Sequence, residues 1–225
     1  MEKTHTTVLR VLVGSQAHGL EAPESDVDFR SVFVIPTADM FRLGFKYEST
    51  RLREGRPEGQ MDEASWEVGR FLALAVQCHP LVLETFLAPV TTMDEWGKEL
   101  RGLFPAVWSA RRAYDAFLGY AANQRKKFLE KKDGRPEKYA AAYVRVLYNL
   151  CELLRSDSFA VRIADTPVGE TIGRIKQGQM SAGAVIDLGE DWMQEAARRL
   201  ETCRHEADLE RVNGFLIRLR KAFLV

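Results

Sequence analysis

Two aspartates, one residue apart, are the side chains in this sequence that are best suited to chemistry. Asp26 and Asp28 open an apolar run, and alternate residues of a strand project to the same face of a sheet. Adjacent carboxylates repel each other, and a divalent cation between them relieves that repulsion. Oxygen ligands of this kind suit Mg²⁺, which commonly lies between carboxylates and substrate phosphates. The pair therefore predicts a site for Mg²⁺ or Mn²⁺.

A turn of small residues, Gly14-Ser15, precedes the aspartates by ten residues and ends another apolar run. Gly14 allows the backbone to approach a ligand closely, and a helix that begins after Ser15 presents free N–H groups to a phosphate. Turn and aspartates together predict a nucleoside triphosphate, with its phosphates on the turn and its metal on the acids. A plain strand–turn–strand is the alternative.

The segment from Gly14 to Arg30 resembles the signature of the DNA polymerase beta-type nucleotidyltransferase superfamily. The closer resemblance is to its predicted nucleotidyltransferase branch of bacteria and phages. The matching positions are Gly14, Ser15, Gly19, Leu20, Pro23, Ser25, Asp26 and Asp28. A second block at residues 62–84 and a fainter third block at residues 138–145 extend the resemblance over roughly residues 7–180.

The resemblance implies transfer of a nucleoside monophosphate from a nucleoside triphosphate, such as ATP, to an acceptor, with release of pyrophosphate. Asp26 and Asp28 would hold two metal ions together with a third acid from a later strand, which also deprotonates or orients the acceptor. Asp62 is the expected third acid because it opens the second block. Glu63 competes with it, since a register change of one residue exchanges their faces. The simpler alternative makes Asp62 the N-cap of a following helix.

Other residues near the motif are expected to assist. Ser15 matches a family position and is predicted to bond a phosphate oxygen. Arg30 continues the alternation of Asp26 and Asp28, so it is predicted either to contact phosphate or to form an ion pair at the strand end. His18 lies in the turn, where contact with the triphosphate competes with the role of a solvated loop histidine.

Basic residues further along the chain are candidates for phosphate and acceptor binding. Lys138 and Arg145, seven residues apart on a predicted helix, match positions where the family carries a Lys and then an Arg, and are predicted to bind the nucleotide. A solvated basic edge of that helix is the alternative. Residues 124–138 carry seven basic side chains against three acids, which suits an RNA acceptor or simply a charged helix end.

The charge balance leaves the acceptor open. The chain has 32 basic and 32 acidic residues, so it is not an evident nucleic-acid binder over its whole surface. The candidate acceptors are RNA (tRNA-like), a small molecule, or a protein, as in toxin–antitoxin-type nucleotidylation. A domain that binds nucleotide or a partner without catalysis is the non-enzymatic alternative.

Three further features predict a cytoplasmic protein that does not enter a membrane. No apolar run approaches the ~20 residues that span a bilayer. The N-terminus is polar and has no signal-peptide core. Three cysteines, far apart and odd in number, fit small buried side chains in a reducing compartment: Cys78, Cys151 and Cys203.

The sequence pattern of the elements that must position the motif changes from strand-like to helical near residue 65. Strands are expected at residues 7–13, 27–35 and 41–50, with an exposed loop at 51–60. Amphipathic helices are expected afterwards, at residues 66–75, 81–87, 111–132, 137–155, 190–203 and 208–224. The predicted fold is α+β, a small mixed β-sheet nucleotidyltransferase core followed by a helical C-terminal region. The predicted domains are a catalytic domain at 1–105 and a helical domain at 106–225.

Overall fold

The computed structural model describes residues 5–22, 25–45, 51–55 and 60–224, and of residues 51–55 and 60–62 it describes the backbone alone. The chain divides into two compact units. Unit 1 comprises Met1–Val76, Leu81–Val107 and Ala207–Val225, and unit 2 comprises Gln77–Pro80 and Trp108–Glu206.

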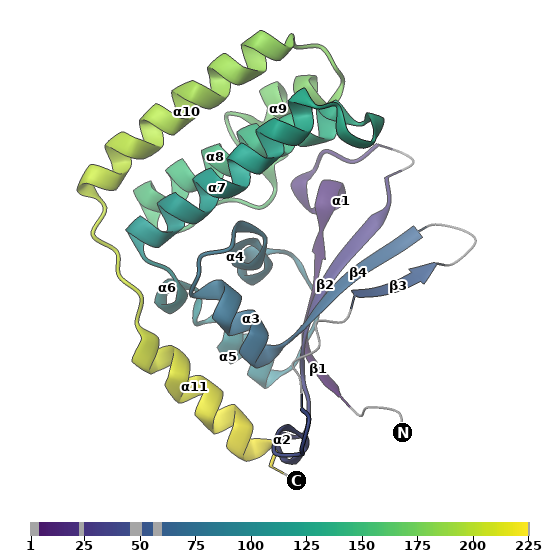
Figure 1. The fold of residues 1–225 in the computed structure, drawn as a ribbon, viewed down its shortest axis with the longest axis vertical. Helices are drawn as coiled ribbons and strands as arrows, with labels where there is room; N and C mark the ends of the chain where they lie inside the picture. The colour runs from purple at the N-terminus through teal and green to yellow at the C-terminus, as the bar shows by residue number, and fades with distance from the viewer. Residues whose placement is uncertain (1–4, 23–24, 46–50, 56–59, 225) are drawn as a thin grey trace. The chain divides into compact units, whose positions relative to one another are not determined.

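A mixed five-stranded sheet forms the core of unit 1 (Figure 1). Its strands are β1 (Thr6–Val13), β2 (Val27–Val34), β3 (Arg51–Gly55), β4 (Gln60–Glu67) and β5 (Val90–Met93), in the order β3-β4-β2-β1-β5. β2 and β4 run parallel, and the other neighbouring pairs run antiparallel. The sheet confirms the mixed α+β prediction and the first two predicted strands.

One face of the central strands is apolar and buried. Val11, Val13 and Val32 lie on it, and β-branched side chains of this kind favour strands. Because Val13 pairs with Asp28, the buried face ends in a carboxylate. The opposite face carries Arg10, whose guanidinium lies 3.7 Å from the centre of the Phe29 ring.

Short helices complete unit 1. They are α1 (Gly14–His18), α2 (Thr37–Met40), α3 (Val68–Ala75), α4 (Pro80–Leu87, in this unit from Leu81 on), α5 (Glu95–Arg101), α6 (Phe104–Val107) and α11 (Leu209–Ala222). α3 packs on β2 and β4, and α5 packs on β1. Phe71 of α3 meets Phe86 of α4 with their ring centres 5.0 Å apart, so both helices share one apolar core.

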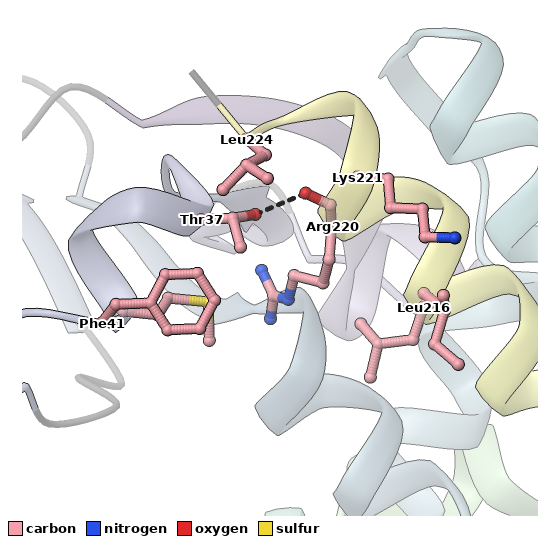
Figure 2. Close-up of a pocket in the computed structure, with 8 residues that line it drawn as sticks. Thr37, Phe41, Leu216, Arg220, Lys221 and Leu224 are labelled. Carbon is pink, nitrogen blue, oxygen red and sulfur yellow. Dashed lines mark hydrogen bonds between the residues drawn. The ribbon is translucent and has the colours of Figure 1, made fainter.

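The last helix, α11, returns to unit 1 (Figure 2). Thr37 donates its hydroxyl to the Arg220 carbonyl (2.8 Å) and its N–H to the Phe223 carbonyl (2.8 Å). The Arg220 guanidinium lies 2.6 Å from the buried carboxylate of Glu67. The predicted division at 105/106 placed this segment in the helical domain. In the structure this segment belongs to unit 1 instead, because the apolar side of α11 packs on α3, α5 and α6.

Unit 2 is helical. Its elements are α7 (Ala110–Leu129), the 3₁₀ turn η1 (Lys132–Gly134), α8 (Pro136–Ser156), the 3₁₀ turn η2 (Ile163–Asp165), α9 (Gly169–Lys176) and α10 (Ala182–Thr202). α8 packs against α7, α9 and α10. Gly189 allows α10 to approach α8, because a methyl group there would overlap the Tyr143 ring. The predicted helical region is thereby confirmed.

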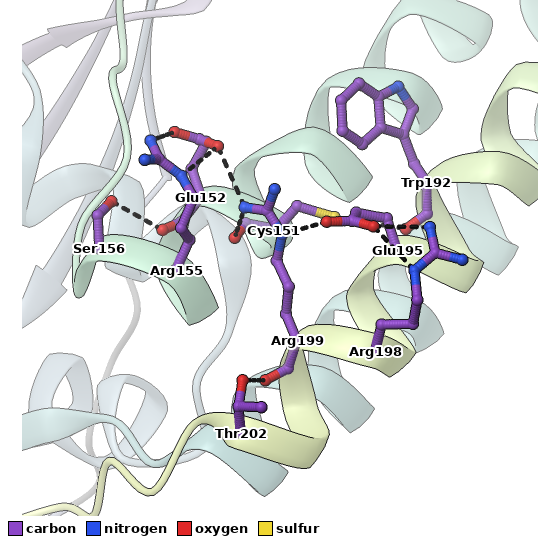
Figure 3. Close-up of polar contacts among 9 residues, drawn as sticks. All are labelled: Cys151, Glu152, Arg155, Ser156, Trp192, Glu195, Arg198, Arg199 and Thr202. Atoms are coloured by element: carbon purple, nitrogen blue, oxygen red, sulfur yellow. Dashed lines mark hydrogen bonds and ion pairs between the residues drawn. The ribbon is translucent and has the colours of Figure 1, made fainter.

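Polar contacts join α8 to α10 (Figure 3). Arg199 donates to the Cys151 carbonyl (2.8 Å) and to the Glu195 carboxylate (2.6 Å). Burial raises the pKa of the Cys151 thiol to about 12, so it remains protonated at neutral pH. Cys78 is also buried, and both thiols therefore occupy the core as the sequence predicted; Cys203 is half-buried.

Several predicted elements were wrong. Residues 41–45, expected in a strand, form turns with Phe41 and Leu43 exposed, and residues 46–50 lie outside the described residues. The loop expected at 51–60 contains β3 and the first residue of β4, because polar residues form an edge ladder there. The predicted helix at 66–75 begins at Val68, since Trp66 continues β4. β5 was not predicted, and α10 begins eight residues before position 190, at Ala182.

In the part of the chain that the structure describes, no individual helix has both the length and the apolar character to cross a membrane. Two neighbouring helices reach that length and apolar character only when taken together, and they meet at a bend of 112°: Val68–Ala75 and Pro80–Leu87.

Candidate active site

The glycine turn and one of the two aspartates lie in contact. β1 ends at Val13 and α1 begins at Gly14, which has a left-handed φ of +71°. A methyl group built on Gly14 would overlap Oδ2 of Asp28 and lie 3.0 Å from its Cγ. Position 14 therefore requires glycine for two reasons: its backbone conformation is left-handed, and the carboxylate occupies the space of a side chain.

Strand pairing aligns the predicted third acid with this contact. Asp28 pairs with Val13 on one side and with Asp62 of the parallel strand β4 on the other. Paired residues share a face of a sheet, so position 62 lies on the face of Asp28. Glu63 pairs with Phe29, one step along the strand and on the opposite face. The register therefore favours Asp62 over Glu63 as the third acid, although the Asp62 side chain is outside the described residues.

Glu63 has other partners on its own face. Arg10 donates to its carboxylate from Nε (3.3 Å) and Nη2 (3.1 Å), and the Ser31 hydroxyl also donates to it. These three side chains form an ion-pair cluster on the face away from Asp28. The cluster accounts for an acid at position 63 without a metal.

Asp26 stands immediately before β2 and is exposed. The turn in front of it is closed by Ser25, whose N–H donates to the Ala22 carbonyl (2.9 Å) and whose hydroxyl accepts from the Ala22 N–H (2.8 Å). Serine suits such turns because its hydroxyl bonds to nearby backbone groups. The turn delivers Asp26 to the edge of the sheet two residues before Asp28.

Helix α1 leaves its first backbone N–H groups without a capping side chain. Its N-cap is Val13, which has no acceptor, whereas Glu67 at the N-cap of α3 accepts from the Gly69 N–H (2.7 Å). Uncapped N–H groups at a helix start attract anions. Ser15 is the second residue of α1 and is half-buried. Its predicted bond to a phosphate oxygen stays a prediction.

A buried acid connects the turn to the strand. Glu84 on α4 has a side chain only 2% exposed, and its two oxygens lie 2.9 Å from His18 Nε2 and 2.8 Å from Arg30 Nη1. Arg30 also donates to the Leu81 carbonyl (2.7 Å). Arg30 therefore forms an ion pair, one of its two predicted roles, and His18 belongs to a buried network. The predicted contact of Arg30 with phosphate is untested.

Sequence reasoning missed the role of Glu84. It is the single charged residue in the apolar helix Pro80–Leu87, and a lone acid at a buried position requires a partner. That signal predicts an ion pair. The partners come from residues more than fifty positions away, so only the fold identifies them.

The acids of the site suit a hard cation. Asp26 and Asp28 supply carboxylate oxygens, the ligands that Mg²⁺ and Mn²⁺ prefer. Among the side chains that the structure describes, no three His, Cys, Asp or Glu residues form a group able to hold a metal. The third predicted ligand, Asp62, has a side chain outside the described residues, so the three-acid metal site stays a prediction.

The two basic residues predicted to bind nucleotide lie on α8 of unit 2. Lys138 is exposed near the start of that helix, and Arg145 is 8% exposed in its buried middle. The two residues therefore differ in environment, despite their spacing of two turns. Their predicted contact with a triphosphate stays a prediction.

Replacing Gly14 with alanine is expected to lower the free energy of unfolding by more than the same change at Gly44. Both glycines have a positive φ, +71° and +80°, so alanine costs about 1–2 kcal/mol at each. Only the methyl group at position 14 meets Asp28, since nothing lies within 4 Å of the one at position 44. We expect an additional loss of about 1–3 kcal/mol for Gly14→Ala in urea denaturation. Equal losses would show that the carboxylate does not rest on the turn.

A match to a known family covers most of this chain. A family model described as RlaP, RNA repair pathway DNA polymerase beta family, matches residues 1–166. The chain is 25% identical over 135 residues to a 38.9 kDa protein from the nrdC–mobD intergenic region of Enterobacteria phage T4. That match covers 54% of this chain and 38% of the phage protein, so the chain spans well under half of that relative.

A search of solved structures returns a crystal structure of a nucleotidyltransferase-like protein from Exiguobacterium sibiricum. The alignment covers 96% of this chain and 74% of that one, at 9% sequence identity and a TM-score of 0.31.

Proposed function

The chain belongs to the RNA repair pathway DNA polymerase beta family, and from this premise we propose that it is a metal-dependent nucleotidyltransferase. It transfers a nucleoside monophosphate from a nucleoside triphosphate to an acceptor and releases pyrophosphate. The observation that carries the proposal is the contact between Asp28 and the Gly14 turn, with Asp62 in register beside it. The Asp28 carboxylate thus lies against the turn that we propose as the phosphate-binding element.

Each residue of the proposed active site has a role. Asp26, Asp28 and Asp62 would hold Mg²⁺ or Mn²⁺, and the bound metal would supply stabilisation of charge on the attacking and leaving oxygens. The turn at Gly14 and Ser15 binds the triphosphate through backbone N–H groups. An acceptor oxygen forms a bond to the α-phosphorus, and the bond to the bridging oxygen of the pyrophosphate breaks. Asp62 takes the proton of the acceptor hydroxyl.

RNA is the acceptor that we favour. The family is described by its place in RNA repair, and the basic stretch at residues 124–138 adds an electrostatic reason. The chain matches only 38% of the phage relative. We therefore propose the acceptor and the partners of the whole protein and do not transfer them from that relative. A cytoplasmic location is proposed with it, since the three cysteines are free thiols.

The test is incubation with each α-labelled nucleoside triphosphate and Mg²⁺ or Mn²⁺, with total RNA and total protein as acceptors. Label in RNA supports the proposal as stated. Label in protein instead supports nucleotidylation of a protein partner, as in toxin–antitoxin systems. If neither pool is labelled and no labelled small-molecule product forms, while calorimetry shows that the protein binds Mg–ATP, the domain is a non-catalytic nucleotide binder and the enzymatic proposal fails.

A further inference from the structure

The connection between α7 and α8 presents three cations at one exposed tip. Lys131, Lys132 and Arg135 are all exposed, and they flank or belong to the 3₁₀ turn η1. We call these three residues the basic tip. Nearby cations on α7 have partners, since Arg125 lies 3.7 Å from Glu190 and Lys126 lies 3.8 Å from Glu130.

Two acids beside the basic tip have partners outside it. Glu130 is held by Lys126, and Asp133 accepts a hydrogen bond from the Tyr139 hydroxyl (2.7 Å). The same hydrogen bond to Asp133 raises the pKa of Tyr139 above its ordinary value. Within the described residues, no ion pair neutralises a cation of the basic tip. Residues 131–138 carry four basic side chains against two acids, so the tip lies in a locally positive stretch of a chain whose total charge is zero.

The backbone holds the basic tip in one uncommon conformation. Lys131 (φ 48°), Asp133 (φ 55°) and Gly134 (φ 64°) are all left-handed. Non-glycine residues adopt this conformation at a cost, and such positions concentrate where a fixed local geometry serves binding. The Tyr139–Asp133 hydrogen bond fastens the turn to the first turns of α8. Preorganisation of this kind lowers the entropy cost of binding a ligand.

We propose that the basic tip binds the phosphate backbone of single-stranded RNA. Three exposed cations without acidic partners, held on a fixed turn, fit a polyanion better than a single small anion, because they can contact successive phosphates. The inference deepens the proposed function, on whose RNA acceptor it rests. Its test measures binding alone, so that failure of the tip and failure of catalysis are distinguishable.

The experiment titrates the full chain into fluorescein-labelled oligo(U) and follows anisotropy over a range of KCl concentrations. Three phosphate contacts to a single strand predict a slope of log K against log salt of about −2, or roughly a 20-fold loss of affinity between about 50 and 200 mM salt. The variant Lys131→Gln/Lys132→Gln/Arg135→Gln is expected to reduce the magnitude of that slope by about 2.

A matched control removes three exposed arginines of unit 2 outside the tip: Arg111→Gln/Arg162→Gln/Arg174→Gln. The control is expected to keep the parent slope. A charge-conserving variant, Lys131→Arg/Lys132→Arg/Arg135→Lys, is expected to bind like the parent, and melting temperatures establish that all variants fold. Equal binding by the tip variant and the control would overturn the proposal. So would failure of the parent to bind oligo(U), or binding to phosphatidylserine vesicles in place of oligo(U).

Discussion

Replacing Asp28 with asparagine is expected to lower the rate of nucleotidyl transfer by about 10³-fold or more. The change removes an anionic ligand but conserves the shape that packs against Gly14. Metal-assisted charge stabilisation contributes several kcal/mol, and each 1.4 kcal/mol corresponds to about tenfold in rate. The measurement is the single-turnover rate of transfer from an α-labelled nucleoside triphosphate at saturating Mg²⁺. The free energy of unfolding should change by less than about 1 kcal/mol, because the carboxylate is half-exposed.

Two comparisons make this result specific. Asp39→Asn removes a half-exposed acid that pairs with Arg42 on the same unit, and it should leave the rate unchanged. Asp62→Asn should resemble Asp28→Asn, whereas Glu63→Gln should reduce the rate far less, because Glu63 faces Arg10. A normal rate in Asp28→Asn would remove that residue from the metal site. A larger loss in Glu63→Gln than in Asp62→Asn would reverse the assignment of the third acid.

Replacing Glu84 with leucine is expected to lower the free energy of unfolding by about 3–5 kcal/mol, because it leaves the Arg30 charge without its acid partner. The Arg30 side chain is only 12% exposed, so water replaces the lost carboxylate poorly. His18 loses an acceptor in the same step, which loosens the end of α1. Urea denaturation followed by circular dichroism measures the loss.

A double-mutant cycle separates the ion pair from the packing of α4. The variant Glu84→Leu/Arg30→Leu removes both charges and should recover part of the stability, giving a coupling free energy of about 0.5–3 kcal/mol. If the two single losses simply add, the 2.8 Å contact does not contribute an interaction of its own. Transfer activity in the double variant then shows whether Arg30 has a role beyond its pair with Glu84.

The central part of the fold was predictable from local patterns. β1 and β2 are β-branched apolar runs with turn residues between them, and long helices such as α7 and α8 have clear apolar periodicity. The small residues Gly14 and Ser15 mark the turn between the strands. These signals are short-range, so one sequence is enough to identify them.

The remaining elements depend on partners far along the chain. β3 is a polar edge strand, Arg51–Gly55, and its pairing with β4 rather than its composition makes it a strand. The short strand β5 exists because it pairs with β1, eighty residues earlier in the chain. α11 has the pattern of any amphipathic helix, and nothing in that pattern indicates that Thr37 and Glu67 fix it to unit 1.

In the candidate site too, some residues were identifiable from the local sequence and others only from the tertiary structure. Asp26 and Asp28 were identifiable from residue types and spacing. The choice between Asp62 and Glu63 needed the parallel register of β2 and β4, because one position of slip exchanges the faces. Glu84 needed the tertiary structure, since its two partners come from a helix end and a strand.

The course of the chain between the two units has a consequence for how this protein can vary. The outgoing and returning segments are hydrogen-bonded to each other twice, from the Asp208 N–H to the Ala106 carbonyl and from the Ala110 N–H to the His205 carbonyl (both 2.9 Å). Residues 108–206, which with Gln77–Pro80 make up unit 2, thus form a segment whose two ends meet, and insertions of this form are readily tolerated by a host domain. Evolution or an engineer can lengthen, shorten or exchange the helices at this junction and leave the strand order of the host sheet intact.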